Sequence, residues 1–218
     1  MNADTLFDHL TVNRYGRFTL PDAIRPGAGV PIMPREGYRT RIYRDRAAGL
    51  RLPMLSAAVS AEKLFDAFLA LLEPLGEDAA VVLESSHGRD ADDCREFRRS
   101  HIDMPVLASH FCDFEELLLN DGCTGVAVLN AEIPMEVQFD EHKLLHVYAP
   151  DLTPFRKALR ALDIPRRKEL PLICEAEHLH HTSDEYEDQF RLLCLRVGVG
   201  DFEAVFSDDD SESESEWA

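Results

Sequence analysis

The sequence lacks the features that mark secreted and membrane-spanning proteins. Residues 1–8 contain no basic segment followed by an apolar run, so they do not resemble a secretory signal. The most apolar stretch, residues 64–75, contains Asp66, Glu73 and Pro74, which make it too short and too polar to cross a bilayer. The five cysteines are odd in number and irregularly spaced, which argues against a disulfide framework. We therefore expect a cytoplasmic protein with no membrane contact.

The sequence also lacks a motif that specifies a reaction. The segment Gly27-Ala-Gly29 has no preceding strand and no third glycine, which a dinucleotide-binding loop needs. The aspartates at 90, 92 and 93 lack the glycine and the distal glutamate of a calcium-binding EF-hand. Function therefore has to be inferred from the distribution of charge and histidine.

Charge is divided unevenly along the chain. Residues 1–51 contain nine arginines, no lysine and five acidic residues, a net charge of +4. Residues 52–200 have a net charge of −14, and residues 201–218 contain eight acidic residues and no basic one. Segregated charge of this kind indicates contact with another macromolecule or within the molecule. The overall charge of −18 opposes general binding to nucleic acid, because phosphates are repelled.

The same pattern divides the chain into three regions. Residues 1–51 form an N-terminal extension rich in Arg, Pro and Gly, and its five aromatic residues predict that it packs on the body. Residues 52–200 form a single α+β domain. Residues 201–218 form an acidic tail whose charge density predicts disorder. Its serines at 207, 211 and 213 precede acidic residues, the pattern that acidophilic kinases accept, although a solubilising role is the simpler interpretation.

Residue patterns from position 52 onward predict alternating strands and helices. Strands are expected at 52–59, 79–84, 125–129 and 170–177, with a hairpin formed by 135–139 and 143–149. Helices are expected at 60–75, in the charged segment 89–100, from Asp113, from Thr153, and from Thr182 to Gly198. This order predicts an α+β protein with a mixed β-sheet and helices mainly on one face. An elaborated ferredoxin-like sandwich is the first candidate.

Histidine is concentrated in two short stretches. His142 and His146 lie in and after the turn of the predicted hairpin. Cys174, His178 and His180 would share one face of an extended segment, because alternate residues of a strand point the same way. Imidazole combined with a thiolate suits zinc or a related divalent ion. These five residues are therefore the candidate metal ligands.

A metal centre of this kind would support catalysis if it kept one coordination position open. A water molecule in that position would be activated by the ion, with Glu141 or Glu177 as the base. The alternative is a set of ordinary hydrogen-bonded histidines, because His-x-His-His is not by itself a ligand motif.

Two further segments carry weaker chemical signals. Cys123 lies in Asp121-Gly-Cys-Thr-Gly125, between a helix end and a strand start, and we interpret it as a small residue in a tight turn. The segment Ser85-Ser86-His87-Gly88 follows a buried strand, where α/β proteins often place sites. It lacks the glycine pattern of a nucleophile elbow, so no catalytic role is assigned to it.

Arginine in the N-terminal extension offers a candidate interaction surface. Arg39, Arg41, Arg44, Arg46 and Arg51 lie in and after a predicted short strand at residues 38–44, with tyrosines at 38 and 43. Arginine and tyrosine are favoured at protein interfaces, and both also contact single-stranded nucleic acid. Because the rest of the chain is strongly acidic, we favour a protein partner, self-association or docking on the chain's own body over nucleic acid.

The leading functional hypothesis from the sequence is protein binding or assembly rather than catalysis. It follows from the absence of a reaction motif and from the charge division. The first alternative is a metal-dependent, hydrolase-like enzyme that uses the histidine cluster. The second is nucleic-acid binding through the arginine-rich arm.

Overall fold

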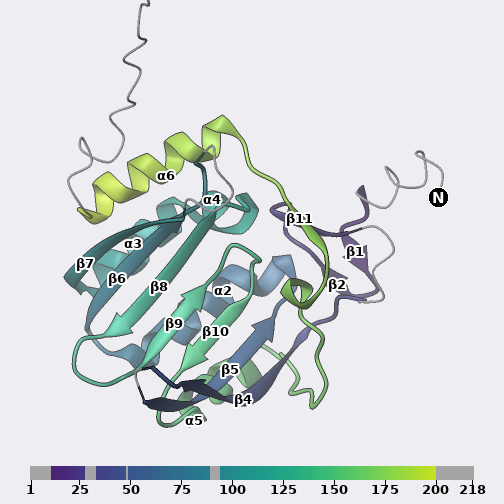
Figure 1. Ribbon diagram of the computed structural model, residues 1–218, viewed down its shortest axis with the longest axis horizontal. Helices are drawn as coiled ribbons and strands as arrows, with labels where there is room; N and C mark the ends of the chain where they lie inside the picture. Colours follow the sequence, from purple (N-terminus) through teal and green to yellow (C-terminus); the bar gives the residue numbers. More distant parts are fainter. Residues whose placement is uncertain (1–10, 28–32, 48, 89–93, 200–218) are drawn as a thin grey trace, which may run out of the picture.

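A seven-stranded β-sheet organises the chain, in the order β4-β5-β10-β9-β8-β6-β7 (Figure 1). The computed structural model describes residues 11–27, 33–47, 49–88 and 94–199. The strands of this sheet are β4 (Gly37–Asp45), β5 (Leu50–Ala58), β6 (Asp78–Ser85), β7 (Arg95–Asp103), β8 (Thr124–Asn130), β9 (Glu136–Phe139) and β10 (Leu145–Tyr148). All neighbouring strands in it are antiparallel.

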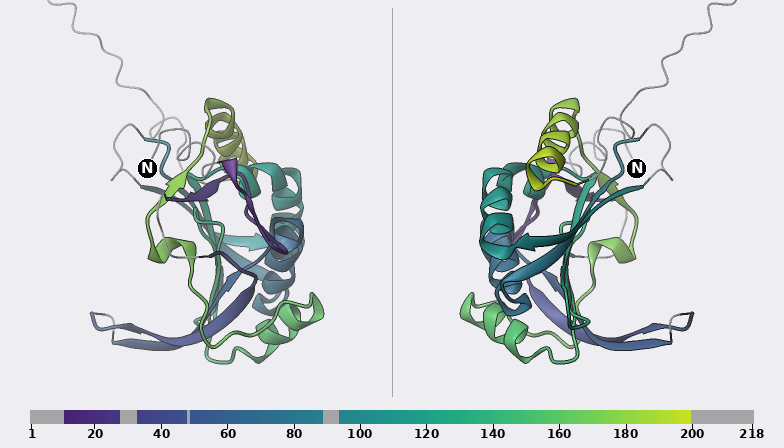
Figure 2. Two further views of the ribbon diagram at one scale, coloured as in Figure 1. Left: turned by 90° about the vertical axis from the view of Figure 1, so that its right-hand side faces the viewer. Right: turned by 90° about the vertical axis from the view of Figure 1, so that its left-hand side faces the viewer.

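The helices lie mainly on one face of this sheet. They are α2 (Ala61–Leu72), α3 (Met104–Asp113), α4 (Glu115–Asn120), α5 (Thr153–Ala161) and α6 (Asp184–Val197), with short 3₁₀ turns η1 (Glu73–Leu75) and η2 (Ile173–Glu175). Helices α2, α3 and α5 cover the face, and α6 lies across one end of the sheet against α3 and α4 (Figure 2). The α+β class with helices mainly on one face is thereby confirmed. Across the described residues, no helix combines the length and apolar composition that a bilayer crossing requires.

Strand alternation separates an apolar face from a polar one. Leu55, Val128 and Phe139 point to the helices and are completely or almost completely buried. Phe68 of α2 meets Phe139 with ring centroids 5.1 Å apart, so the helix and the sheet share one core. Burying one such side chain stabilises the fold by about 1.5–3 kcal/mol, which makes this face the main source of stability.

Two strand-helix-strand connections cross the sheet. Helix α2 joins β5 to β6, which run in the same direction with three antiparallel strands between them. Helices α3 and α4 join β7 to β8, with β6 between them. Both are split units, whose parallel strands are separated by antiparallel neighbours.

The opposite face is partly covered by the N-terminal segment. It contains β1 (Arg14–Tyr15), β2 (Phe18–Thr19) and β3 (Ile24–Pro26), and β3 pairs with the late strand β11 (His178–His180). A second apolar cluster fills the space beneath it: Phe18, Leu20, Ile24, Ala58, Leu144, Leu170, Leu172 and Ile173. The N-terminal residues therefore bring the segment around β11 onto the sheet (Figure 2).

The boundary predicted at residue 51 falls inside β5. Strand β4 pairs with β5 from Gly37 opposite Ala58 to Asp45 opposite Leu50, so residues 37–45 form the edge of the main sheet. The start of β4 is buried on both faces, at Gly37, Tyr38 and Arg39, whereas residues 41–44 are exposed. The acidic tail at 201–218 lies outside the described residues.

Three local predictions are corrected by the structure. Residues 95–100, which were expected to be helical, instead belong to β7, because Phe97 and Ile102 of this strand are buried against the core. Asp113 ends α3 instead of starting a helix, and α4 begins at Glu115. In the segment 170–177, η2 replaces the expected strand, and pairing with β3 begins only at His178. In each case tertiary contacts outweighed the local pattern.

Candidate metal centre

Three of the five predicted ligands meet on the side of the sheet opposite the main helices. The ring centroids are 4.7 Å apart for His142 and His178, 5.0 Å for His142 and His180, and 5.0 Å for His178 and His180. One potential ligand atom from each residue lies within 4.8 Å of the other two. Three rings that bind one zinc ion through nitrogen at about 2.0 Å have centroids about 5 Å apart. The spacing of the rings therefore suits a single ion.

Local backbone structure explains why these side chains meet. His178 and His180 are alternate residues of β11, so they share a face, and pairing with β3 fixes that strand. His142 lies in the turn between β9 and β10, where the Lys143 amide donates to the Asp140 carbonyl at 3.0 Å. Lys143 itself has a φ of 59°, the left-handed conformation that closes the turn. The turn presents His142 to the face of β11.

Each of the three imidazoles is held through its Nδ1 atom. The Nδ1 atoms of His178 and His180 lie 2.7 Å from the Ala176 carbonyl and 2.6 Å from the Gly122 carbonyl. That of His142 lies 3.2 Å from Asp140 Oδ2. A carbonyl oxygen only accepts hydrogen bonds, so Nδ1 carries the proton in His178 and His180. Nε2 is then the nitrogen with a free lone pair, which is the arrangement found in histidines that bind metals.

Asp140 is the electrostatic centre of the turn. Burial opposes its ionisation, but hydrogen bonds from His142 and His146 outweigh that effect and hold the pKa of Asp140 well below its ordinary value. Burial likewise opposes protonation of His142, yet the Asp140 carboxylate raises the pKa of His142. For His180, burial lowers the pKa despite its bond to Gly122, so this imidazole is neutral and able to bind a metal at neutral pH.

The other two predicted ligands are not in the three-ring cluster. His146 is buried in β10, with Nδ1 2.9 Å from Ser56 Oγ and Nε2 3.3 Å from Asp140 Oδ2, so hydrogen bonds occupy both its nitrogens. Cys174 lies in η2, and burial of its thiol, assisted by nearby carboxylates, raises its pKa to about 11. His146 instead supports Asp140, which in turn orients His142.

Only one of the two predicted bases lies beside the cluster. Glu141 Oε1 is 3.7 Å from His142 Nδ1, and its side chain is 40% exposed. Glu177 packs against β3, where a Cβ atom on Gly27 would be 2.7 Å from its Cγ. Of these two carboxylates, Glu141 is thus the one that contacts a ring of the cluster, on the Nδ1 side of His142.

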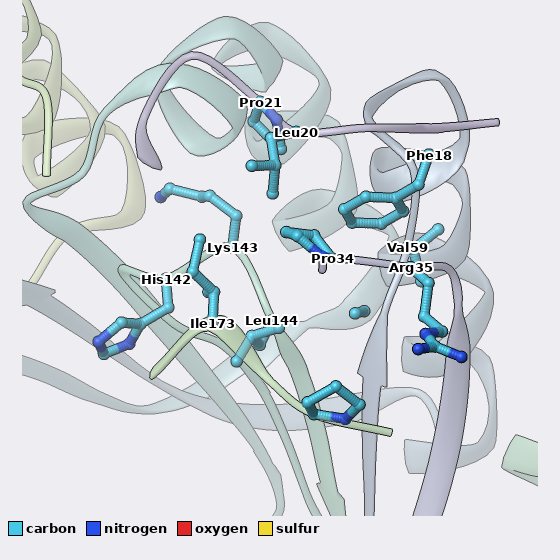
Figure 3. Close-up of a pocket in the computed structure, with 12 residues that line it drawn as sticks. Phe18, Leu20, Pro21, Pro34, Arg35, Val59, His142, Lys143, Leu144 and Ile173 are labelled. Atoms are coloured by element: carbon cyan, nitrogen blue, oxygen red, sulfur yellow. The ribbon is translucent and has the colours of Figure 1, made fainter. Parts of the chain in front are cut away.

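A small cavity lies beneath the turn. It has a volume of about 20 Å³, room for one water molecule, and Phe18, Leu20 and Ile173 form part of its apolar wall. His142 and Lys143 reach away from this wall (Figure 3). The Lys143 ammonium donates to the Thr124 carbonyl at 2.9 Å, and burial lowers the pKa of Lys143 to about 8. The cavity is therefore part of the support beneath the cluster and too small for a substrate.

The predicted arginine surface divides into one buried and four exposed residues. Arg39 is buried and forms two hydrogen bonds with Glu175, at 2.6 and 3.1 Å, and a third with the Leu170 carbonyl at 2.6 Å. Arg41 is 3.6 Å from the same carboxylate, but its side chain is 63% exposed. Arg44, Arg46 and Arg51 are exposed around the β4–β5 hairpin. Arg39 thus ties the edge strand to the segment that leads into β11.

Sequence reasoning did not identify Asp140 or the Gly122 carbonyl as parts of the centre. The segment Asp140-Glu-His142 did contain a signal for Asp140, because a carboxylate two residues from a histidine in a turn can orient the imidazole ring. The Gly122 carbonyl is a backbone group, which no pattern of residue types indicates. Comparison with protein-family models, with curated proteins and with solved structures gives no match for this chain.

Proposed function

We propose that the protein binds one divalent metal ion, zinc or a close relative, through Nε2 of His142, His178 and His180. The supporting observation is that an oxygen atom engages Nδ1 of all three rings while their centroids lie 4.7–5.0 Å apart. Histidines that cluster for other reasons are not required to direct the same ring nitrogen toward the centre of the cluster. Here each ring is turned so that the same nitrogen is left for a ligand bond.

The number of protein ligands favours chemistry over a purely structural role. Structural zinc sites usually close their shell with four protein ligands, whereas three ligands leave a position for water. His180 is exposed, so that position is reached from solvent. A bound divalent ion lowers the pKa of its water to about 7. Glu141, which lies beside the His142 ring, is the base that we assign to accept the proton. The proposed activity is therefore metal-dependent hydrolysis.

Metal binding is tested on protein purified without a metal-affinity tag. We expect elemental analysis to find one equivalent of zinc less in His178→Ala than in the wild type, and calorimetric titration to show an affinity loss of at least about 100-fold at this cluster. His181→Ala is the matched control, because this exposed neighbour is outside the cluster. An affinity at the cluster that is equal in wild type, His178→Ala and His180→Ala would rule the proposal out.

The β4–β5 hairpin supports a second candidate function, self-association. Ile42, Tyr43 and Leu50 are 45%, 37% and 39% exposed there, beside exposed Arg44 and Arg51. The polar face of the sheet carries the complementary negative charge, because four glutamates lie near one another there: Glu84, Glu96, Glu136 and Glu141. Burial raises the pKa of Glu84, and the other three carboxylates add to that rise. We propose that the hairpin of one copy contacts this acidic face of a second copy.

Sedimentation at low and high salt tests the self-association. We expect a dimer at low ionic strength that dissociates as salt screens the charges. The double substitution Arg44→Glu and Arg51→Glu should abolish it, whereas Arg14→Glu, a control far from the hairpin in the sequence, should not. A wild-type monomer at all protein and salt concentrations would eliminate this candidate.

A further inference from the structure

A second group of potential ligands lies on the other side of the turn formed by residues 121–124. It consists of His87, two residues after the end of β6, together with Asp121 and Cys123. One ligand atom from each lies within 4.8 Å of the other two, and His87 Nε2 is 3.1 Å from Asp121 Oδ2. Nothing in the three-histidine centre uses these side chains. The backbone also joins the two groups, because the Gly122 carbonyl between Asp121 and Cys123 holds His180.

His87 carries a buried nitrogen that lacks a hydrogen bond. Its side chain is 5% exposed, and its Nδ1 is 2.8 Å from Ser85 Oγ. Among the residues that the structure describes, no group meets the geometry of a hydrogen bond with Nε2, although the Asp121 carboxylate is only 3.1 Å away. Buried polar atoms without a partner are uncommon and require an explanation. A metal ion bonded to both Nε2 and Oδ2 would supply one.

Asp121 is held in place as metal-binding carboxylates usually are. It is completely buried, its Oδ1 accepts from the Cys123 amide at 3.3 Å, and its Oδ2 accepts from the Thr124 hydroxyl at 2.5 Å. The Ser86 amide donates to the Cys123 carbonyl at 3.0 Å, which ties the turn to the end of β6. Hydrogen bonds of this kind orient ligands before the ion arrives.

Local charge also suits a dication. Asp121 and a Cys123 thiolate supply two negative charges, which balance a divalent ion when His87 is neutral. The Lys143 ammonium donates to the neighbouring Thr124 carbonyl and leaves one positive charge beside the group. In the metal-free protein, burial and the nearby Asp121 carboxylate raise the pKa of the Cys123 thiol, with the Lys143 ammonium opposing that rise, so the thiol gives up its proton when the ion binds. Helix α6 closes the group from above, since the Phe190 ring lies 5.8 Å from the His87 ring.

We propose that His87 Nε2, Asp121 Oδ2 and Cys123 Sγ bind a second divalent ion of the thiolate-preferring class, such as zinc. Binding forms a metal–sulfur bond and releases the Cys123 thiol proton to solvent. This site too has only three protein ligands, but the Phe190 ring of α6 lies beside it. We therefore assign it a structural role, in which it fixes the turn whose Gly122 carbonyl orients His180. The site itself does not depend on metal binding by the three histidines.

Cobalt(II) substitution separates the two sites. A thiolate ligand gives a near-ultraviolet sulfur-to-cobalt charge-transfer band, which a centre built only of histidines cannot produce. We expect this band in the full-length wild-type protein, its loss in Cys123→Ser, and its retention in Cys174→Ser, which changes an exposed cysteine. It should also persist in His178→Ala, even if the three-histidine centre binds nothing. Absence of the band in wild type, or its persistence in Cys123→Ser, would overturn the proposal.

A second measurement uses the unaltered chain, in case Cys123→Ser fails to fold. Zinc should slow the alkylation of Cys123 by at least about 10-fold, measured by peptide mass spectrometry, because the metal-bound sulfur is no longer a free nucleophile. The exposed Cys112 of α3 is the internal control, and its rate should be unchanged. Equal rates for Cys123 with and without zinc would contradict the site even if a cobalt band were seen.

Discussion

The two groups of potential ligands differ in charge and in access to solvent. The group of His142, His178 and His180 has three neutral ligands and an exposed member, so an ion bound there keeps its full charge and meets water. The group of His87, Asp121 and Cys123 would have two anionic ligands once Cys123 gives up its proton to an ion, and it lies under α6. The contrast is the reason why we propose chemistry for the first group and support of the fold for the second.

The turn at residues 121–124 connects the two groups. Its Asp121 and Cys123 side chains belong to the buried group, and its Gly122 carbonyl belongs to the exposed one. Changes in the turn should therefore affect both groups, whereas changes at the outer histidines should affect one. The following predictions use this difference, from the largest expected effect to the smallest.

Asp121→Ala should give the largest loss of stability. It removes a fully buried carboxylate, leaves the Cys123 amide and the Thr124 hydroxyl without their acceptor, and takes away the charge beside His87. Breaking such a buried charged network costs about 3–5 kcal/mol, measured by urea denaturation. Asp78→Ala is the control, because that side chain is 51% exposed, and its cost should stay below about 1 kcal/mol. Similar losses for the two variants would contradict the support role of the buried group.

Gly122→Ala should damage both groups. A Cβ atom there would lie 2.6 Å from the Ala23 carbonyl and 2.9 Å from the His181 carbonyl, so backbone must move. We expect a loss of about 1–3 kcal/mol on urea denaturation and weaker zinc binding by calorimetry. Gly125→Ala is the matched control, because its closest neighbour is the flexible end of Glu84 at 3.0 Å. Unchanged zinc affinity in Gly122→Ala would break the proposed link between the groups.

Asp140→Asn should weaken the exposed group alone. The new side chain can still accept the hydrogen bond from the Leu144 backbone N–H, which is 2.8 Å long in the wild type. It lacks the negative charge that orients His142. Loss of such a supporting carboxylate lowers metal affinity by about 10–100-fold, measured by calorimetry. The cobalt–thiolate band of the buried group should be unaltered. A change in that band would show that the two groups are not separable at this residue.

Acid should weaken the anchoring of β11 by a smaller amount. The Arg39 hydrogen bond lowers the pKa of Glu175 from its ordinary value of 4.5 in the folded protein. This ion pair therefore stabilises the fold above pH 4.5, and the contribution is lost as the pH falls through the lowered folded-state pKa. The carboxylate is 36% exposed, so we expect less than about 1 kcal/mol in thermal denaturation across that range. Glu175→Gln should remove this part of the pH dependence. If stability varied with pH identically in both proteins, the Arg39–Glu175 ion pair would not contribute to it.

Elements with strong local signals were predicted well. The hairpin of β9 and β10 followed from alternation on both sides of a polar turn, and α5 from Thr153 followed by Pro154. Helix α6 ends at Gly198 in the left-handed conformation, as its glycine indicated. The segment that became β7 carried no such signal, because its many charged residues mark an exposed edge in either structure. The packing of Phe97 against the sheet and against Phe190 of α6 favours the strand over the helix.

By itself, the sequence determined the residues that are available to bind metal and part of their arrangement. His178 and His180 share a face because alternation along an extended chain is a local property. It also determined the α+β class, through periodic apolar patterns. Only the tertiary structure decided that His142 joins them, that His146 and Cys174 do not, and that His87 meets Cys123. Those choices depend on pairing between β11 and β3 and on the turn at 121–124, contacts between residues far apart in the chain. Long-range pairing has no local pattern, so side chains that it brings together cannot be recognised from their spacing in the sequence.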